Sequence, residues 1–190
     1  MHRDHRQENK LEKFIIEQFT KTTLYADYIS RGNITDDPFI KSRLQIDKKV
    51  PTLAIVIGES GIGKTTSICK YVEGLRNSKD PVPVMFISVQ KDPTKFNLKD
   101  FYESSFGTND TVKIYETLRK LFGDREKTNK DPATIIIDNI QYCRDENGKI
   151  HSGLLTFFNN ILYQGLGMSI ILTSSVNNAA YEIDQGFLFL

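Results

Sequence analysis

Residues 58–65 read Gly-Glu-Ser-Gly-Ile-Gly-Lys-Thr, and this stretch decides the fold. It fits the pattern G-x-x-x-x-G-K-[ST] at every fixed position. In that pattern the glycines let successive backbone N–H groups point toward one phosphate. The apolar run Leu53–Ile57 comes directly before it, and Ile68, Val72 and Leu75 follow at helical spacing. A strand, a glycine-rich loop and a helix in this order predict a phosphate-binding loop, or P-loop, rather than a glycine-rich turn without a ligand.

The P-loop predicts a nucleotide site that includes Mg²⁺. We expect Lys64 to reach the outer phosphates and Thr65 to offer its hydroxyl to Mg²⁺, a hard cation that prefers oxygen ligands. The positive end of the following helix adds to the attraction for phosphate. The residues predicted to hold the nucleotide are Gly58, Glu59, Ser60, Gly61, Ile62, Gly63, Lys64, Thr65 and Thr66.

A second motif ends in Asp138. Residues 134–137 are Thr-Ile-Ile-Ile, an unbroken β-branched run that is typical of a strand buried on both faces. An aspartate at the carboxyl end of such a strand is what Mg²⁺ needs besides the hydroxyl of Thr65, so Asp138 is the candidate Walker B residue. The alternative is that Asp138 caps a turn, a common use of aspartate at strand ends. The presence of a P-loop favours the metal ligand.

The rest of the chain alternates strands and helices. Further strands are expected at 82–89, 169–173 and 187–190, with helices near 98–105, 114–122 and 154–162, and an amphipathic helix in the first twenty residues. This alternation predicts right-handed crossovers and helices on both faces of the sheet. The expected fold class is therefore α/β: a three-layer α/β/α P-loop NTPase with a five-stranded, mainly parallel sheet.

We divide the chain into an N-terminal helical entry segment, 1–49, and a P-loop NTPase core, 50–190. The chain stops on the apolar sequence Phe-Leu-Phe-Leu at 187–190, and a free apolar strand invites edge pairing. We therefore expect a module of a longer protein whose core lacks a C-terminal lid domain.

Composition excludes few functions. The chain has 190 residues, enough for one α/β domain, and a net charge of +1, so no overall basic field indicates nucleic acid or membrane. No apolar run approaches the roughly 20 residues that span a bilayer. Cys69 and Cys143 match no metal or redox spacing, which suits a reducing compartment. We expect an intracellular protein, cytoplasmic or nuclear.

Three segments, 61–66, 135–139 and 170–175, resemble the AAA+ and STAND branches of the P-loop ATPases in order and placement. The resemblance covers residue 51 to the end, and residues 138–142 are also similar to bacterial replication-initiator ATPases. It implies ATP (or ADP) and Mg²⁺ as cofactors. It also implies a polar residue that senses the γ-phosphate at the end of the late strand, among Thr173, Ser174 and Ser175. The motifs do not choose between the two branches.

Two departures from the family pattern concern hydrolysis. Hydrolytic AAA+ proteins usually carry an acid after the Walker B aspartate, but this chain has Asn139. An amide can hold water but cannot accept its proton, which removes a general-base contribution of about 10²- to 10⁴-fold. The last arginine is Arg144, and Ser175 stands where STAND proteins often carry one. The residues predicted to take part in catalysis are Lys64, Asn139 and Ser175.

Three functions remain open. The leading one is an ATP- and Mg²⁺-binding AAA+/STAND-type ATPase module whose hydrolysis is weak, or depends on a missing domain or on a partner that supplies an arginine. That partner is a second copy of the chain or a regulatory protein. The second is a nucleotide-gated interaction switch without significant hydrolysis. The third is a DNA-associated ATPase, for which the candidate phosphate contacts are Lys10, Lys13, Lys41, Arg43, Lys48 and Lys49.

Overall fold

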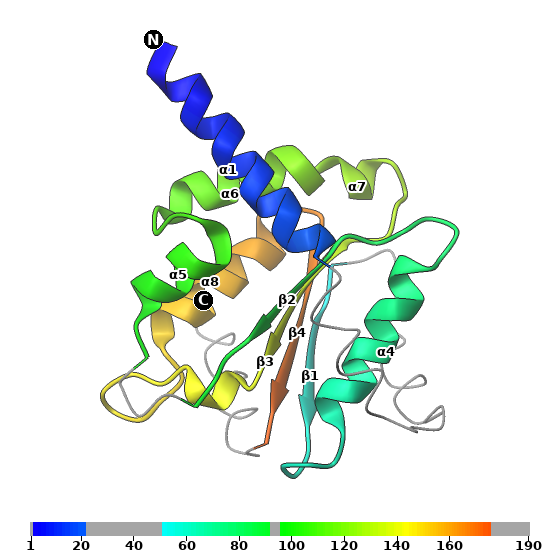
Figure 1. Ribbon diagram of the computed structural model, residues 1–190, viewed down its shortest axis with the longest axis vertical. Coiled ribbons are helices and arrows are strands. Elements are labelled where there is room, and N and C mark those ends of the chain that lie inside the picture. The colour runs from blue at the N-terminus through cyan, green and yellow to red at the C-terminus, as the bar shows by residue number, and fades with distance from the viewer. Residues whose placement is uncertain (1, 22–50, 92–95, 176–190) are drawn as a thin grey trace.

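The computed structural model describes residues 2–21, 51–91 and 96–175, and the sheet lies at its centre (Figure 1). The order of the four strands is β1-β4-β3-β2, and every pair is parallel. Their bounds are β1 Leu53–Ile57, β2 Val84–Ser88, β3 Ala133–Asp138 and β4 Met168–Ser174. The four strands expected in this part of the chain are confirmed. The fifth, at 187–190, and most of the entry segment lie outside the described residues.

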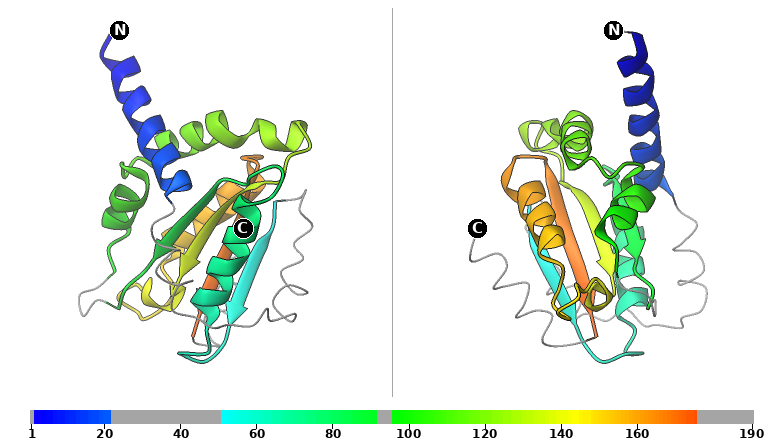
Figure 2. Two further views of the ribbon diagram at one scale, coloured as in Figure 1. Left: turned by 45° about the vertical axis from the view of Figure 1, so that its right-hand side comes forward. Right: turned by 90° about the vertical axis from the view of Figure 1, so that its left-hand side faces the viewer.

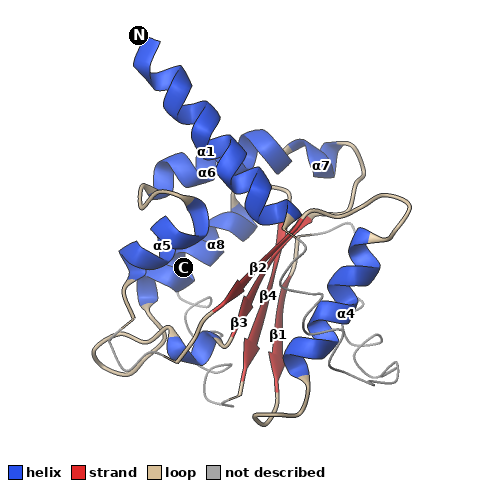
Figure 3. Cartoon of the chain, viewed as in Figure 1, coloured by secondary structure: helices blue, strands red, loops and turns tan. Residues whose placement is uncertain are grey.

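Helices connect the strands (Figure 3). Several begin at residues whose side chains accept backbone N–H groups: Asn97 caps α5, Asp110 caps α6 and His151 caps α8. The bounds are α1 His2–Thr20, α4 Lys64–Arg76, α5 Leu98–Phe106, α6 Thr111–Phe122, α7 Asp124–Lys127, the 3₁₀ helix η1 Ile140–Tyr142 and α8 Ser152–Tyr163. The segment 124–132, for which the sequence analysis names no helix or strand, contains the short helix α7.

Helices cover both faces of the sheet (Figure 2). On one face α4 is the only helix among the described residues, and its Ile68 and Val72 pack with Ile136 and Ile171. On the other face α1, α5, α6 and α8 build the larger core, to which β3 contributes Ile135 and Ile137. Successive residues of β3 thus enter opposite cores, because side chains alternate along a strand. The predicted three-layer α/β/α arrangement is confirmed.

The first helix packs beside β2 with its C-terminal half, and its N-terminal half projects beyond the core (Figure 1). Ile15 and Phe19 are buried, as their spacing predicts. A guanidinium nitrogen of Arg76, at the end of α4, donates to Phe19 O at 3.2 Å and to Val84 O at 3.0 Å. This side chain ties α1 to the start of β2. None of the helices that the structure describes has the length and apolar character required to cross a lipid bilayer.

Candidate functional site

The predicted site residues meet at the carboxyl edge of the sheet, where α/β proteins commonly bind ligands. β1 runs directly into the P-loop, and β4 lies beside it with Ile57 opposite Ser174. The backbone N–H of Gly58 continues this pairing by donating to Ser174 O at 3.2 Å. β3 lies on the other side of β4 and ends at Asp138. Parallel pairing therefore brings the three sequence motifs to one place.

The P-loop depends on glycine at two positions. Gly61 has φ of 82° and Gly63 has φ of 93°, a region that side chains with a Cβ rarely adopt. Gly63 directly precedes α4, so this turn directs the chain into the helix. Glu59 and Ser60 lie at the exposed surface of the loop, and the side chain of Ile62 is 68% exposed.

Lys64 folds back over the P-loop. Its ammonium donates to Gly58 O and to Glu59 O, both at 2.8 Å. The side chain is only 8% exposed, so the charge lies within the concave side of the loop rather than in open solvent. A lysine held there can contact phosphate oxygens as a point charge.

Asp138 is the centre of the site and is only 2% exposed. The Thr65 hydroxyl lies 3.1 Å from Oδ1 and 3.0 Å from Oδ2, so it donates to the two oxygens together. The Thr173 hydroxyl donates to Oδ1 at 2.6 Å, and Asn139 Nδ2 donates to Oδ2 at 3.2 Å. These donors are side chains from three segments, which is unlike the backbone N–H groups of a turn cap.

The pair formed by Thr65 and Asp138 fits Mg²⁺ by its chemistry, because a hydroxyl and a carboxylate are hard oxygen ligands. The part of the chain that the structure describes contains no group of three His, Cys, Asp or Glu residues able to hold a metal ion. Mg²⁺ usually keeps several waters and takes one or two protein ligands plus substrate phosphates. Two protein ligands beside a P-loop agree with this coordination preference.

Asn139 occupies a backbone conformation that the sequence analysis does not anticipate. Its φ is 67° and its ψ 46°, a left-handed conformation in which asparagine is favoured over most other side chains. Its N–H donates to Thr173 Oγ1 at 3.0 Å. The left-handed backbone thus gives a reason, independent of catalysis, for asparagine at the position after Asp138.

Of the three candidate sensor residues, Ser175 is the most open. Thr173 and Ser174 are fully buried, whereas Ser175 is half-buried. The Ser175 hydroxyl accepts a 2.9 Å hydrogen bond from Nε2 of Gln141, a buried side chain that the sequence analysis missed. The available signal is that three of the four residues from Asp138 to Gln141 are polar, directly after the apolar run of the strand.

The cysteine nearest to the site is chemically quiet. Cys69 lies in α4 and is buried, and burial, with a smaller contribution from the Asp138 carboxylate, raises its pKa to about 12. A thiol in this state stays protonated and behaves as a small apolar group.

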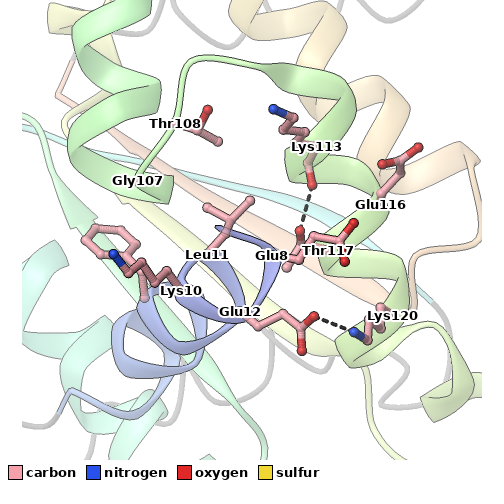
Figure 4. A pocket seen from close by; sticks show the side chains of 11 residues that line it. Glu8, Lys10, Leu11, Glu12, Gly107, Thr108, Lys113, Glu116, Thr117 and Lys120 are labelled. Carbon is pink, nitrogen blue, oxygen red and sulfur yellow. Dashed lines mark hydrogen bonds and ion pairs between the residues drawn. The ribbon is translucent and has the colours of Figure 1, made fainter. Parts of the chain in front are cut away.

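A separate hollow of about 550 Å³ lies between α1, the α5–α6 connection and α6 (Figure 4). Residues of the P-loop, β3 and β4 do not line it. Its rim carries both signs of charge, including Lys113, and an ion pair between Glu12 and Lys120 joins α1 to α6 across it. This hollow is therefore separate from the P-loop site.

Comparison with known proteins agrees with this fold. Residues 47–175 match the family model described as AAA domain. A search of curated proteins gives no match. A Walker-type ATPase of Pyrococcus abyssi has a similar fold, with a TM-score of 0.56 at 14% identity over 80% of this chain and 49% of that one. This chain therefore spans about half of the length of that structure.

Two assemblies give lower TM-scores. A chain of the E. coli MS115-1 HORMA:CdnC:Trip13 complex has a TM-score of 0.46 at 10% identity, over 94% of this chain and 60% of that one. A chain of Drosophila ORC bound to poly(dA/dT) DNA and Cdc6 has a TM-score of 0.46 at 12% identity, over 94% and 29%. The family model alone covers about two thirds of the sequence. The chain belongs to the AAA domain family and is a P-loop ATPase module of the AAA+ kind.

Proposed function

We propose that this module binds ATP (or ADP) with Mg²⁺ at residues 58–66 and hydrolyses ATP weakly on its own. The observation that carries the proposal is the contact between the Thr65 hydroxyl and both oxygens of Asp138, at 3.1 and 3.0 Å, directly beside the P-loop. Backbone N–H groups of the loop and Lys64 would hold the phosphates. Thr65 and Asp138 would hold Mg²⁺, which supplies charge neutralisation on the phosphates when it is bound.

The residues around Asp138 support positioning of water more than removal of its proton. Asn139 uses one Nδ2 hydrogen on Asp138 Oδ2 at 3.2 Å, which leaves its second amide hydrogen for a water molecule. Amides do not act as general bases near neutral pH, so the attacking water must lose its proton without help from this side chain. Ser175 is the candidate contact for the γ-phosphate, since its side chain is more open than those of Thr173 and Ser174.

The structure gives little support for contact between the γ-phosphate and an arginine from the described residues near the site. Arg144 Nε donates to Gln141 O at 2.9 Å, and its Nη1 donates to Gly148 O. Its guanidinium is thus engaged by the turn that follows η1. An arginine that reaches the γ-phosphate contributes about 10³- to 10⁵-fold in rate. We therefore propose that a second copy, a regulatory protein or another domain supplies it.

Calorimetric titration of ATP and Mg²⁺ into the Lys64→Ala variant tests the proposal. We expect tight binding to be lost, because the only side-chain ammonium that contacts the loop carbonyls Gly58 O and Glu59 O among the described residues is removed. Lys79→Ala is the matched control, since it removes the same charge from an exposed position beyond the far end of α4. Unchanged ATP affinity in Lys64→Ala would sink the proposal.

One observation favours a second function, a nucleotide-gated interaction switch. The left-handed backbone at Asn139 selects asparagine where a general base would otherwise stand. In this case nucleotide binding orders an interface and hydrolysis is incidental. Tight ATP binding with negligible turnover over a wide range of protein concentrations supports the switch, whereas turnover that rises with protein concentration supports an arginine supplied in trans.

A further inference from the structure

The two side-chain amides beside Asp138 form a chain of hydrogen bonds with a single direction. Ser175 N donates to Gln141 Oε1 at 3.3 Å, and Gln141 Nε2 donates to Asn139 Oδ1 at 3.4 Å. Asn139 Nδ2 then donates to Asp138 Oδ2 at 3.2 Å. We call this sequence of three bonds the amide relay.

The ends of the amide relay fix the orientation of both amides. A backbone N–H can only donate, so Gln141 must turn its oxygen toward Ser175. An ionised carboxylate can only accept, so Asn139 must turn its nitrogen toward Asp138. The Gln141 nitrogen and the Asn139 oxygen are then left facing each other, which is the matched pairing. Rotating either amide by half a turn would put like groups against each other.

Burial makes this arrangement costly to break. Gln141 is 5% exposed, and its Nε2 also donates to Ser175 Oγ at 2.9 Å. Its side chain therefore holds both the backbone and the hydroxyl of Ser175, the residue directly after β4. Water has little access to Gln141, so a lost bond leaves a buried polar group without a partner.

We propose that Gln141 is a positioning residue. It sets the direction of the Asn139 amide beside Asp138 and fixes Ser175 relative to the same carboxylate. Asn139, proposed to hold water, and Ser175, proposed to contact the γ-phosphate, are then held in a fixed position relative to each other. This role rests on the proposed function for its effect on turnover, but the amide relay itself exists without nucleotide.

Two variants separate bonding from packing. Gln141→Met keeps the length of the side chain and removes every hydrogen bond that the side chain makes in the relay. Gln141→Glu keeps an acceptor for Ser175 N but presents a second acceptor to Asn139 Oδ1, so it breaks the relay at one bond. The matched control is Asn160→Ala, which removes a part-buried amide whose Nδ2 donates to Tyr115 Oη at 3.2 Å, outside the site.

The first readout needs no nucleotide: hydrogen exchange of the Asn139 side-chain amide by NMR, with its signal assigned by its loss in Asn139→Asp. We expect slow exchange in the wild-type chain and in Asn160→Ala, and at least about 10-fold faster exchange in both Gln141 variants, because the Asn139 amide loses its orienting partner. Unchanged exchange in either folded Gln141 variant would overturn the amide relay. If Gln141→Met does not fold, Gln141→Glu alone decides.

The second readout is steady-state ATP turnover with the ATP dissociation constant. Loss of a partner that orients a ligand at a metal site typically costs about 10- to 100-fold in activity. We expect a kcat loss of that size with an ATP affinity within about 3-fold of wild type, since Gln141 does not line the P-loop. Equal losses in Asn160→Ala, or faster exchange of Asn139 with unchanged kcat, would reject the positioning role. A failed Lys64→Ala test would instead reject the nucleotide site and leave the exchange result standing.

Discussion

The Thr173 hydroxyl joins Asp138 to the backbone of Asn139. It donates to Asp138 Oδ1 at 2.6 Å and accepts the Asn139 N–H at 3.0 Å, and the side chain is fully buried. Thr173 thus uses its only hydrogen on the carboxylate and a lone pair on the backbone. The bond crosses from β4 to β3, so the position of the strand acid depends on the neighbouring strand.

Replacing Thr173 by valine tests this relationship. Valine has nearly the same shape, but it leaves Asp138 without one donor and Asn139 N without its acceptor. We expect the free energy of unfolding to fall by about 1–3 kcal/mol per unsatisfied buried group, measured by chemical denaturation. Thr173→Ser is the control, since it keeps the hydroxyl and costs about 1 kcal/mol for the methyl group. Equal losses in the two variants would contradict a special role of the hydroxyl.

Replacing Asn139 by glutamate introduces the acid that hydrolytic AAA+ proteins usually carry. If a missing base limits the rate, turnover should rise by up to about 10²- to 10⁴-fold. The same change should lower stability by about 1–2 kcal/mol, because glutamate is disfavoured at a φ of 67°. Asn139→Gly is the control: it accepts the backbone conformation but adds no base. A flat rate in Asn139→Glu with normal ATP binding would point to the missing arginine.

Gly107 sets how closely the α5–α6 connection approaches α1. Its φ is 78°, and a Cβ at this position would lie 2.9 Å from Phe14 Cδ1. Gly165 has φ of 64° with open space around it, so an alanine there meets only the backbone cost. We expect Gly165→Ala to lose about 1–2 kcal/mol and Gly107→Ala to lose about 1–3 kcal/mol more. Hydrogen exchange of α1 should also become faster in Gly107→Ala alone.

The two cysteines should resist thiol reagents in the folded chain. Burial raises the pKa of Cys143 to about 12, and burial with the Asp138 carboxylate raises the pKa of Cys69 to about 12. A raised pKa favours the protonated thiol over the thiolate, and the thiolate is the form that the reagent needs. We expect slow modification by a disulfide reagent in the native chain and rapid modification of both thiols in guanidinium. Fast labelling of the native chain would show that one of them becomes accessible.

The strands and most helices of the described core could be predicted because their signals are local. The apolar run before the P-loop and the β-branched run before Asp138 need no distant partner to be recognised. The pairing of Thr65 with Asp138 also follows from motif order, since parallel strands end at the same edge.

The remaining details depend on contacts that the sequence pattern does not contain. The positive φ of Asn139 reflects the turn into η1, which is held by the neighbouring strand through Thr173. Gln141 and Ser175 meet across 34 residues of sequence, so no local spacing connects them. In the short helix α7, Arg125 Nε donates to Asp131 O at 2.6 Å. This bond is a feature of the folded connection and has no local sequence pattern.

The strand order determines when the site can form during synthesis of the chain. Among the described strands β1 pairs with β4 alone, and Thr52 N contacts Ser169 Oγ across 117 residues. On the ribosome, chains emerge from the N-terminus at roughly 5–20 residues per second, so β1 and its P-loop wait several seconds for their neighbour. The site can therefore assemble only after β4 has been synthesised. ATP bound at the proposed site would stabilise the folded domain, but it would not guide the early folding of the chain.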